Sequence, residues 1–148
     1  MMLLQSTWRS MFKLHLKTRY VETDQGGIVH NSAYIVYLEN ARIDFLQSIG
    51  LDINMLEKGG VQCPVVSQSV KYLKPLFSLQ EIEVHVWIES YSKVRFVLGY
   101  EILRGKDKIL IGQSEHCFLD QNFKPRPLSE ELAKIFKAQV TTCLRFNT

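Results

Sequence analysis

Residues 32–49 are predicted to form a helix that is apolar over most of its circumference. Asn31 or Ser32 is suited to cap its beginning, and Gly50 follows where a left-handed C-terminal residue is expected. Its apolar residues are Tyr34, Ile35, Val36, Tyr37, Leu38, Ala41, Ile43, Phe45, Leu46 and Ile49. Its polar stripe consists of Asn40, Asp44 and Gln47. A helix with so little polar surface requires burial on most sides, so other segments must wrap around it.

Five segments alternate apolar and polar residues, which is typical of half-buried strands. They cover residues 12–20, 65–73, 81–89, 94–103 and 109–119. The links between the last four are short, so we expect these strands to be antiparallel neighbours. After a turn over residues 120–127, Ser129 is suited to cap a short helix. The apolar face of that helix would consist of Leu132, Ile135, Phe136 and Val140.

This order of elements predicts an α+β protein with an antiparallel sheet. Two architectures agree with it, a generic sheet with a helix on one face and a strongly curved sheet around the long helix. The apolar circumference of the helix favours the curved sheet. We expect residues 11–148 to form a single domain, and residues 1–10 to be a mobile leader or an upstream start.

Composition narrows the functional classes. The chain has 148 residues, 46% of them hydrophobic and 22% charged, which is typical of a globular protein. Its net charge of +3 is too small to suggest nucleic-acid binding, although it would not repel a phosphorylated small molecule. No window approaches the roughly 18 apolar residues of a membrane span, and we expect a cytoplasmic protein. Cys63, Cys117 and Cys143 are widely spaced, which predicts reduced thiols and no metal site.

The segment 19–42 places an acid, two glycines and a helix N-terminus within a few residues. Asp24 follows a strand on a turn, and the glycines at 26 and 27 allow close backbone approach. The helix start offers unpaired N–H groups around residues 31–33, which can bind an oxygen that acquires negative charge. An Asp before glycines is also common in turns, where its side chain caps backbone donors. The spacing alone leaves both interpretations open.

The same segment resembles the active-site signature of the 4-hydroxybenzoyl-CoA thioesterase family of hotdog proteins. The matching residues are Tyr20, Glu22, Asp24, Gly27, Ile28, Val29, Tyr34, Glu39 and Arg42. Residues 70–76 resemble the second strand of that family with its Tyr-x-x-Pro exit. The resemblance covers roughly residues 12 to 138 and does not name a substrate.

The resemblance implies the hotdog fold, a curved five-stranded antiparallel sheet wrapped around a long central helix. It also implies a homodimer or homotetramer with the active site at the subunit interface. The activity would be hydrolysis of the thioester of a fatty or aromatic acyl-CoA, or of an acyl group on acyl carrier protein. No separate cofactor would be needed, because coenzyme A is part of the substrate. Asp24 would act as general base or nucleophile, and the backbone N–H of Asn31 would donate to the oxyanion. His30 lies one position before the place where some members carry a His, which makes it a secondary catalytic candidate.

Further residues are candidates for binding the substrate. Gly27 and Tyr34 come from the signature loop, although Tyr34 also suits a core or an interface. Lys93 and Arg95 are our candidates for the phosphates of coenzyme A. A thiolate leaves readily because a thiol pKa is about 8.5, so the site chiefly needs a base, and partial burial would favour Asp24 in that role.

Two other functions remain open at this stage. A hotdog hydratase or dehydratase would use a His with a helix acid, here His30 with Glu39. Glu39 and Arg42 are also spaced to form an ion pair on the helix, which is the interpretation that we favour. The remaining alternative is a non-catalytic acyl-CoA-binding module.

Overall fold

The computed structural model describes the backbone of residues 11–145 and the side chains of residues 11–140. The predicted leader, residues 1–10, lies outside this range. The elements are β1 (Phe12–Lys17), the 3-10 turn η1 (Tyr20–Glu22), α1 (Asn31–Ser48), α2 (Ile53–Lys58), β2 (Val65–Tyr72), β3 (Glu81–Tyr91), β4 (Arg95–Arg104), β5 (Asp107–Cys117) and α3 (Glu130–Arg145). Five strands form one antiparallel sheet in the order β1-β3-β4-β5-β2.

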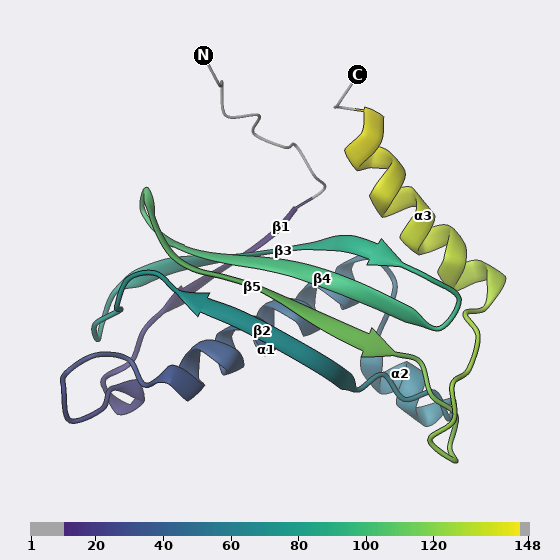
Figure 1. Ribbon diagram of the computed structural model, residues 1–148, viewed down its shortest axis with the longest axis horizontal. Coiled ribbons are helices and arrows are strands. Elements are labelled where there is room, and N and C mark those ends of the chain that lie inside the picture. The colour runs from purple at the N-terminus through teal and green to yellow at the C-terminus, as the bar shows by residue number, and fades with distance from the viewer. Residues whose placement is uncertain (1–10, 146–148) are drawn as a thin grey trace.

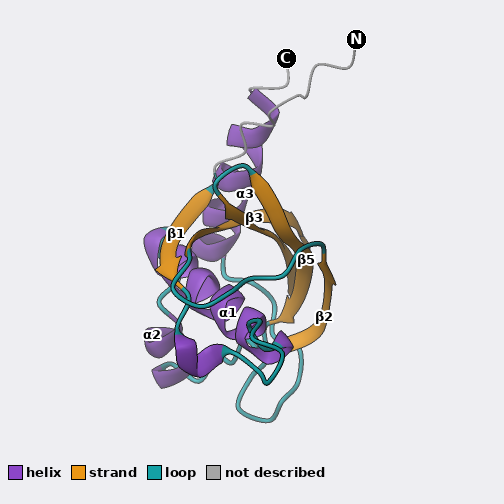
Figure 2. Cartoon of the chain, turned by 90° about the vertical axis from the view of Figure 1, so that its left-hand side faces the viewer, coloured by secondary structure: helices purple, strands orange, loops and turns teal. Residues whose placement is uncertain are grey.

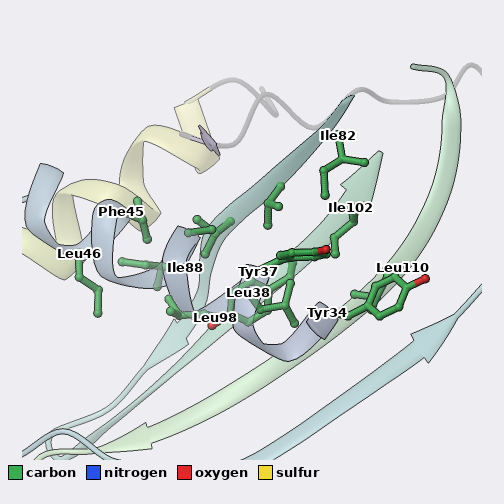
Figure 3. Close-up of a cluster of buried hydrophobic side chains, with 14 of the residues drawn as sticks. Tyr34, Tyr37, Leu38, Phe45, Leu46, Ile82, Ile88, Leu98, Ile102 and Leu110 are labelled. Carbon is green, nitrogen blue, oxygen red and sulfur yellow. The ribbon is translucent and has the colours of Figure 1, made fainter. Parts of the chain in front are cut away.

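The sheet curves around α1, as Figures 1 and 2 show from two directions. Side chains from one side of α1 pack into the concave face of the sheet, and Leu38 and Ala41 are fully buried there. Figure 3 shows this cluster, in which Leu38 of α1 lies among Leu98, Ile102 and Leu110 of the sheet. The predicted α+β class with a curved five-stranded sheet around a long helix is therefore confirmed.

One predicted strand pairing is wrong. We expected β2 and β3 to be neighbours because a short link joins them, but β2 pairs with β5, and β3 lies between β1 and β4. The link does not turn back on β2, because it is bonded to the beginning of α1. The backbone N–H of Val29 donates to the carbonyl oxygen of Leu76 at 2.8 Å. The N–H of Leu79 donates to Thr18, so the link ends beside β1 at the other edge of the sheet.

The helix boundaries also differ in detail from the prediction. Neither Asn31 nor Ser32 caps α1, because His30 is the cap and its Nδ1 accepts from the N–H of Ser32 at 3.1 Å. Gly50 has a φ of +97°, as its predicted place requires. The short helix α2 was not predicted, and α3, with 16 residues, is longer than expected. Ser129 is a correct prediction, since its Oγ accepts from the N–H of Leu132 at 3.2 Å.

The helix α1 is covered on only one side by its own chain. Val36 is 50% exposed and Ile43 is 41% exposed, although both were expected to be buried. At the edge of the sheet, β2 is bonded on one side only among residues 11–145, and its Val66 is 46% exposed. An unpaired strand edge beside exposed apolar side chains is a surface that proteins generally cover. Within the described part of the chain, no helix is long and apolar enough to cross a membrane.

Candidate active site

The loop before α1 is a tight turn built around Asp24. The N–H of Asp24 donates to the carbonyl oxygen of Ile28 at 2.9 Å, and the N–H of Gly27 donates back to the carbonyl oxygen of Asp24 at 3.0 Å. Gly27 has a φ of +80°, a conformation that favours glycine. The side-chain Oδ1 of Asp24 accepts from the N–H of Gly26 at 2.8 Å. The turn-capping interpretation of Asp24 is therefore correct for one of its two carboxylate oxygens.

Glu22 fixes the two ends of this loop to α1. Its Oε1 accepts from the hydroxyl of Tyr37 at 2.8 Å and from the N–H of Arg19 at 2.7 Å. Its carbonyl oxygen accepts from the N–H of His30 at 2.7 Å. Burial and the neighbouring Glu22 carboxylate together raise the pKa of Tyr37, so its hydroxyl stays protonated and donates. The acidic residue two positions before Asp24 is the sequence signal that could have predicted this role, which was not among the expectations.

A pocket of about 430 Å³ opens beside this loop. It is lined by Asp24, Ile28, Val29, His30, Asn31, Tyr34, Tyr72, Leu73, Lys74 and Pro75. Among the residues whose side chains the structure describes, 11–140, Asp24 Oδ2 has no hydrogen-bond partner. The N–H of Asn31 likewise has no acceptor in the described part of the chain, whereas those of Ser32 and Ala33 are both bonded to His30. The pocket therefore contains a carboxylate oxygen and a helix N-terminal donor that the fold does not use.

Two tyrosines form the wall of the pocket between α1 and β2. Tyr34 is buried, and its hydroxyl accepts from the N–H of Leu76 at 3.1 Å. Tyr72 packs edge-on against Tyr34 with ring centroids 5.1 Å apart, and its hydroxyl donates to the carbonyl oxygen of Asn31 at 3.0 Å. Burial raises the pKa of Tyr34, which keeps its hydroxyl neutral at physiological pH. These contacts hold the start of α1 against the exit of β2.

His30 lines the same pocket, and its ring has the structural role of capping the beginning of α1. Nδ1 accepts from the N–H of Ser32, and it lies 2.8 Å from the Ser32 hydroxyl. Glu39, the acid that a dehydratase would pair with His30, lies nine residues along the helix, which is about 13 Å of axial rise. Glu39 instead lies 3.8 Å from Arg42, as the favoured interpretation of the sequence expected. The chain thus brings Asp24 and His30 together and keeps Glu39 apart from them.

Lys93 and Arg95, the residues predicted to bind the phosphates of coenzyme A, do not line the Asp24 pocket. Arg95 donates to Glu115 at 2.8 Å, and Lys93 is in the adjacent β3–β4 hairpin. In Figure 1 this end of the sheet is opposite to the beginning of α1. Arg95 lies level with the start of β2, whereas the pocket lies at the end of β2. The eight residues of β2 separate the two ends by about 23 Å. The cation that lines the pocket is Lys74, which was not among the predicted phosphate-binding residues.

A larger pocket of about 480 Å³ lies on the outer face of the sheet. Gly112 and Trp87 are among its lining residues, and the ring of Trp87 packs over Gly99. It lies on the face of the sheet away from the core, and neither Asp24 nor the beginning of α1 lines it. The Asp24 pocket is therefore the candidate active site. No cluster of three or more side chains of the metal-ligand types occurs among the residues with described side chains.

A curved five-stranded antiparallel sheet wrapped around one long helix defines the hotdog fold. Residues 18–136 match the model of the thioesterase-like superfamily, and the chain belongs to this superfamily. The more specific 4-hydroxybenzoyl-CoA thioesterase family is not distinguished by this match.

Three relatives illustrate the breadth of the superfamily around this chain. YneP of Bacillus subtilis, named as a candidate acyl-CoA thioesterase, is 37% identical over 115 residues, which cover 76% of this chain and 83% of YneP. The acyl-acyl carrier protein thioesterase ATL2 of Arabidopsis thaliana is 28% identical, over 84% of this chain and 67% of ATL2. The crystal structure of the DHNA-CoA thioesterase of Staphylococcus aureus superposes with a TM-score of 0.84 at 27% identity, over 93% and 95% of the two chains. These relatives agree with the prediction of a hydrolase enzyme.

Proposed function

We propose that this protein is a thioesterase that hydrolyses an acyl-CoA, or an acyl group on a carrier protein, to the free acid and the thiol. One observation carries the proposal: the unpartnered Oδ2 of Asp24 and the unpartnered N–H of Asn31 line the same pocket. A thioester hydrolase needs these two groups, a base or nucleophile and an oxyanion donor. Membership of the thioesterase-like superfamily supports this assignment.

In the general-base form of the mechanism, Asp24 removes a proton from water as the water oxygen attacks the thioester carbonyl carbon. The carbonyl oxygen becomes an oxyanion and accepts from the N–H of Asn31 at the helix start. Collapse of this intermediate breaks the carbon–sulfur bond, and the thiolate leaves and takes up the proton. In the nucleophilic form, an oxygen of Asp24 attacks the same carbon and expels the thiolate, and water then hydrolyses the resulting anhydride. His30 borders the same space and is proposed only as an auxiliary group.

We place the chain with the 4-hydroxybenzoyl-CoA thioesterase family within the superfamily, on the signature around Asp24. Gly27 would admit the thioester close to the backbone, and Tyr34 would contact the acyl group from the pocket wall. Two of the relatives are named as thioesterases of acyl-acyl carrier protein and of DHNA-CoA. For this chain we propose a fatty or an aromatic acyl group.

We further propose that a second copy of the chain completes the site in a homodimer or homotetramer. Asp24 is exposed in the single chain, and a partner would supply the burial that favours a catalytic base. If two β2 edges pair antiparallel, the beginning of one lies beside the end of the other. Lys93 and Arg95 of the second copy would then be carried towards the pocket of the first, where the phosphates of coenzyme A could reach them.

The test is release of free thiol from a panel of short, long and aromatic acyl-CoAs, and from the matching acyl carrier proteins. Wild-type protein and Asp24→Asn are compared side by side. Thiol release that collapses in the variant supports the proposal and ranks the acyl groups. If no thioester in the panel is hydrolysed, the proposal is wrong, and hydration of an enoyl-CoA and binding of acyl-CoA without turnover become the functions to measure.

A further inference from the structure

We propose that Arg104, at the end of β4, is a positioning residue that fixes the wall of the Asp24 pocket through the backbone of the link between β2 and β3. The inference rests on the proposed thioesterase function. Arg104 does not line the pocket, and its effect passes through the backbone of Leu76.

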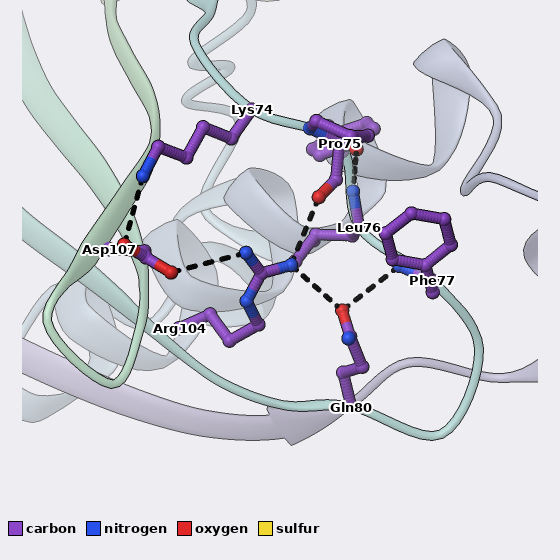
Figure 4. Close-up of polar contacts among 8 residues, drawn as sticks. Lys74, Pro75, Leu76, Phe77, Gln80, Arg104 and Asp107 are labelled. Atoms are coloured by element: carbon purple, nitrogen blue, oxygen red, sulfur yellow. Dashed lines mark hydrogen bonds and ion pairs between the residues drawn. The ribbon is translucent and has the colours of Figure 1, made fainter.

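Arg104 binds three acceptors at once, as Figure 4 shows. Its Nη1 donates to the carbonyl oxygen of Pro75 and to Oε1 of Gln80, both at 3.1 Å. Its Nη2 donates to Oδ2 of Asp107 at 3.3 Å. The Arg104 side chain is 26% exposed, so these bonds are partly shielded from water. The guanidinium therefore ties the two ends of the link, residues 75 and 80, to the β4–β5 hairpin.

Leu76 passes this restraint on to the pocket. It follows Pro75 directly, its side chain is fully buried, and both of its backbone polar groups bind residues of the pocket wall. Its N–H donates to the hydroxyl of Tyr34 at 3.1 Å, and its carbonyl oxygen accepts from the N–H of Val29 at 2.8 Å. Val29 also forms an isolated β-bridge with Thr23, next to Asp24. A shift of the link would therefore move the tyrosine wall and the catalytic loop together.

The geometry of the cluster requires the shape of an arginine. Its acceptors lie on different segments, and a guanidinium presents donors in fixed, diverging directions. A lysine has one nitrogen and cannot reproduce the same fork. The charge of Arg104 is balanced by Asp107, whose carboxylate also accepts from Lys74 at 2.9 Å, and these two cations lower the pKa of Asp107. Neutralisation by a neighbouring carboxylate is expected of a structural cation more than of a phosphate-binding one.

The experiment measures kcat and KM of Arg104→Gln with two thioesters of the same acyl group. One is the coenzyme A ester and the other is the N-acetylcysteamine ester, which carries no phosphates. A displacement of about 1 Å in a catalytic group costs up to about 100-fold, so we expect kcat/KM to fall about 10- to 100-fold on both esters, mainly through kcat. Arg104→Lys should recover part of the loss. Lys108→Gln removes a cation from the same hairpin, one that is paired with Glu101 at 3.5 Å, and is the control for charge alone.

Amide hydrogen exchange gives a readout that does not depend on activity. In Arg104→Gln, protection of the N–H groups of Val29 and Leu76 should fall at least about tenfold, while amides in the middle of β4 keep theirs. If Arg104→Gln does not fold, Asp107→Asn decides, because it removes the carboxylate charge that pairs with the guanidinium and leaves only a weaker amide acceptor at the surface. We then expect a smaller loss in the same direction on both esters.

Three results would overturn the inference. A loss confined to the coenzyme A ester would make Arg104 a phosphate-binding residue. If kinetics and exchange are both unchanged in Arg104→Gln, the link holds its position without the guanidinium. The same result in Asp107→Asn has this meaning if Arg104→Gln does not fold. Normal protection at Val29 and Leu76 with reduced kcat would mean that Arg104 acts by another route. If the wild type hydrolyses no thioester, the proposed function fails, and the exchange data still decide whether Arg104 restrains the pocket wall.

Discussion

Replacing Tyr34 by Phe removes one oxygen from the pocket wall and leaves the ring. In the structure this oxygen accepts from the N–H of Leu76 at 3.1 Å, and both residues are buried. Without it, a buried backbone N–H loses its acceptor. Such a group costs about 1–3 kcal/mol because its desolvation is no longer compensated. We therefore expect Tyr34→Phe to lower the free energy of unfolding by this amount, a large share of the ~5–15 kcal/mol of a small domain.

Urea unfolding of wild type and Tyr34→Phe at one protein concentration measures this cost. Tyr72→Phe is the control for stability, because the Tyr72 hydroxyl bond to the carbonyl oxygen of Asn31 is exposed, and its loss should cost less than about 0.5 kcal/mol. Burial raises the pKa of Tyr34, so its hydroxyl is neutral between pH 6 and 9 and the difference should not change with pH over that range. A loss below about 0.5 kcal/mol for Tyr34→Phe would refute the reasoning, since water would then be replacing the hydroxyl.

Three further results are expected. Burial lowers the pKa of His116 to about 4, below the unfolded value of about 6.5. Stability that is present above pH 6.5 is therefore lost as the pH falls towards 4, by up to about 1.4 kcal/mol per pH unit. His116→Asn should flatten this slope in unfolding curves, and an equal slope in wild type and variant would contradict the prediction. Burial raises the pKa of the Cys63 thiol to about 12, so the thiol stays protonated and unreactive in the native protein. In a Cys143→Ser background, a thiol reagent at pH 8 should label Cys63 only on unfolding. Rapid labelling of Cys63 in the native protein would contradict the prediction. Val36→Lys, on the exposed apolar side of α1, should weaken the oligomer in analytical ultracentrifugation more than Gln47→Lys on the polar stripe, and equal sedimentation of the two variants would place the interface elsewhere.

Much of the fold follows from periodicity, because apolar alternation marks each strand and an apolar circumference marks α1. The position of β2 did not follow, since a short link is compatible with a hairpin and with a crossing to the other edge. That choice depends on the bonds of Leu76 to Val29 and Tyr34, which are long-range contacts without a local pattern. The N-cap of α1, His30, was not predicted for a related reason. A His ring nitrogen accepts from the helix N–H groups only once the local backbone is fixed.

The residues of the candidate site also fall into two groups, those that the sequence predicts and those that only the fold brings together. Asp24, Gly27 and the beginning of α1 are close in sequence, and a local turn brings them together as expected. Lys74 and Arg104 reach the neighbourhood of the pocket only through the order of strands in the sheet, which periodicity does not determine. The exposed apolar side of α1 follows from the same order, because the sheet closes over one side of the helix.

The most direct test of the central claim is the value of kcat for Asp24→Asn on the best thioester of the panel. Asparagine keeps an oxygen that can accept from the N–H of Gly26, so a purely turn-capping role would survive the change. Asp44→Asn, on the exposed polar stripe of α1, removes the same charge away from the pocket. If Asp24 is the catalytic carboxylate, kcat falls about 10²- to 10⁴-fold in Asp24→Asn alone, with unfolding unchanged. A kcat within about twofold of wild type in both variants would contradict the account.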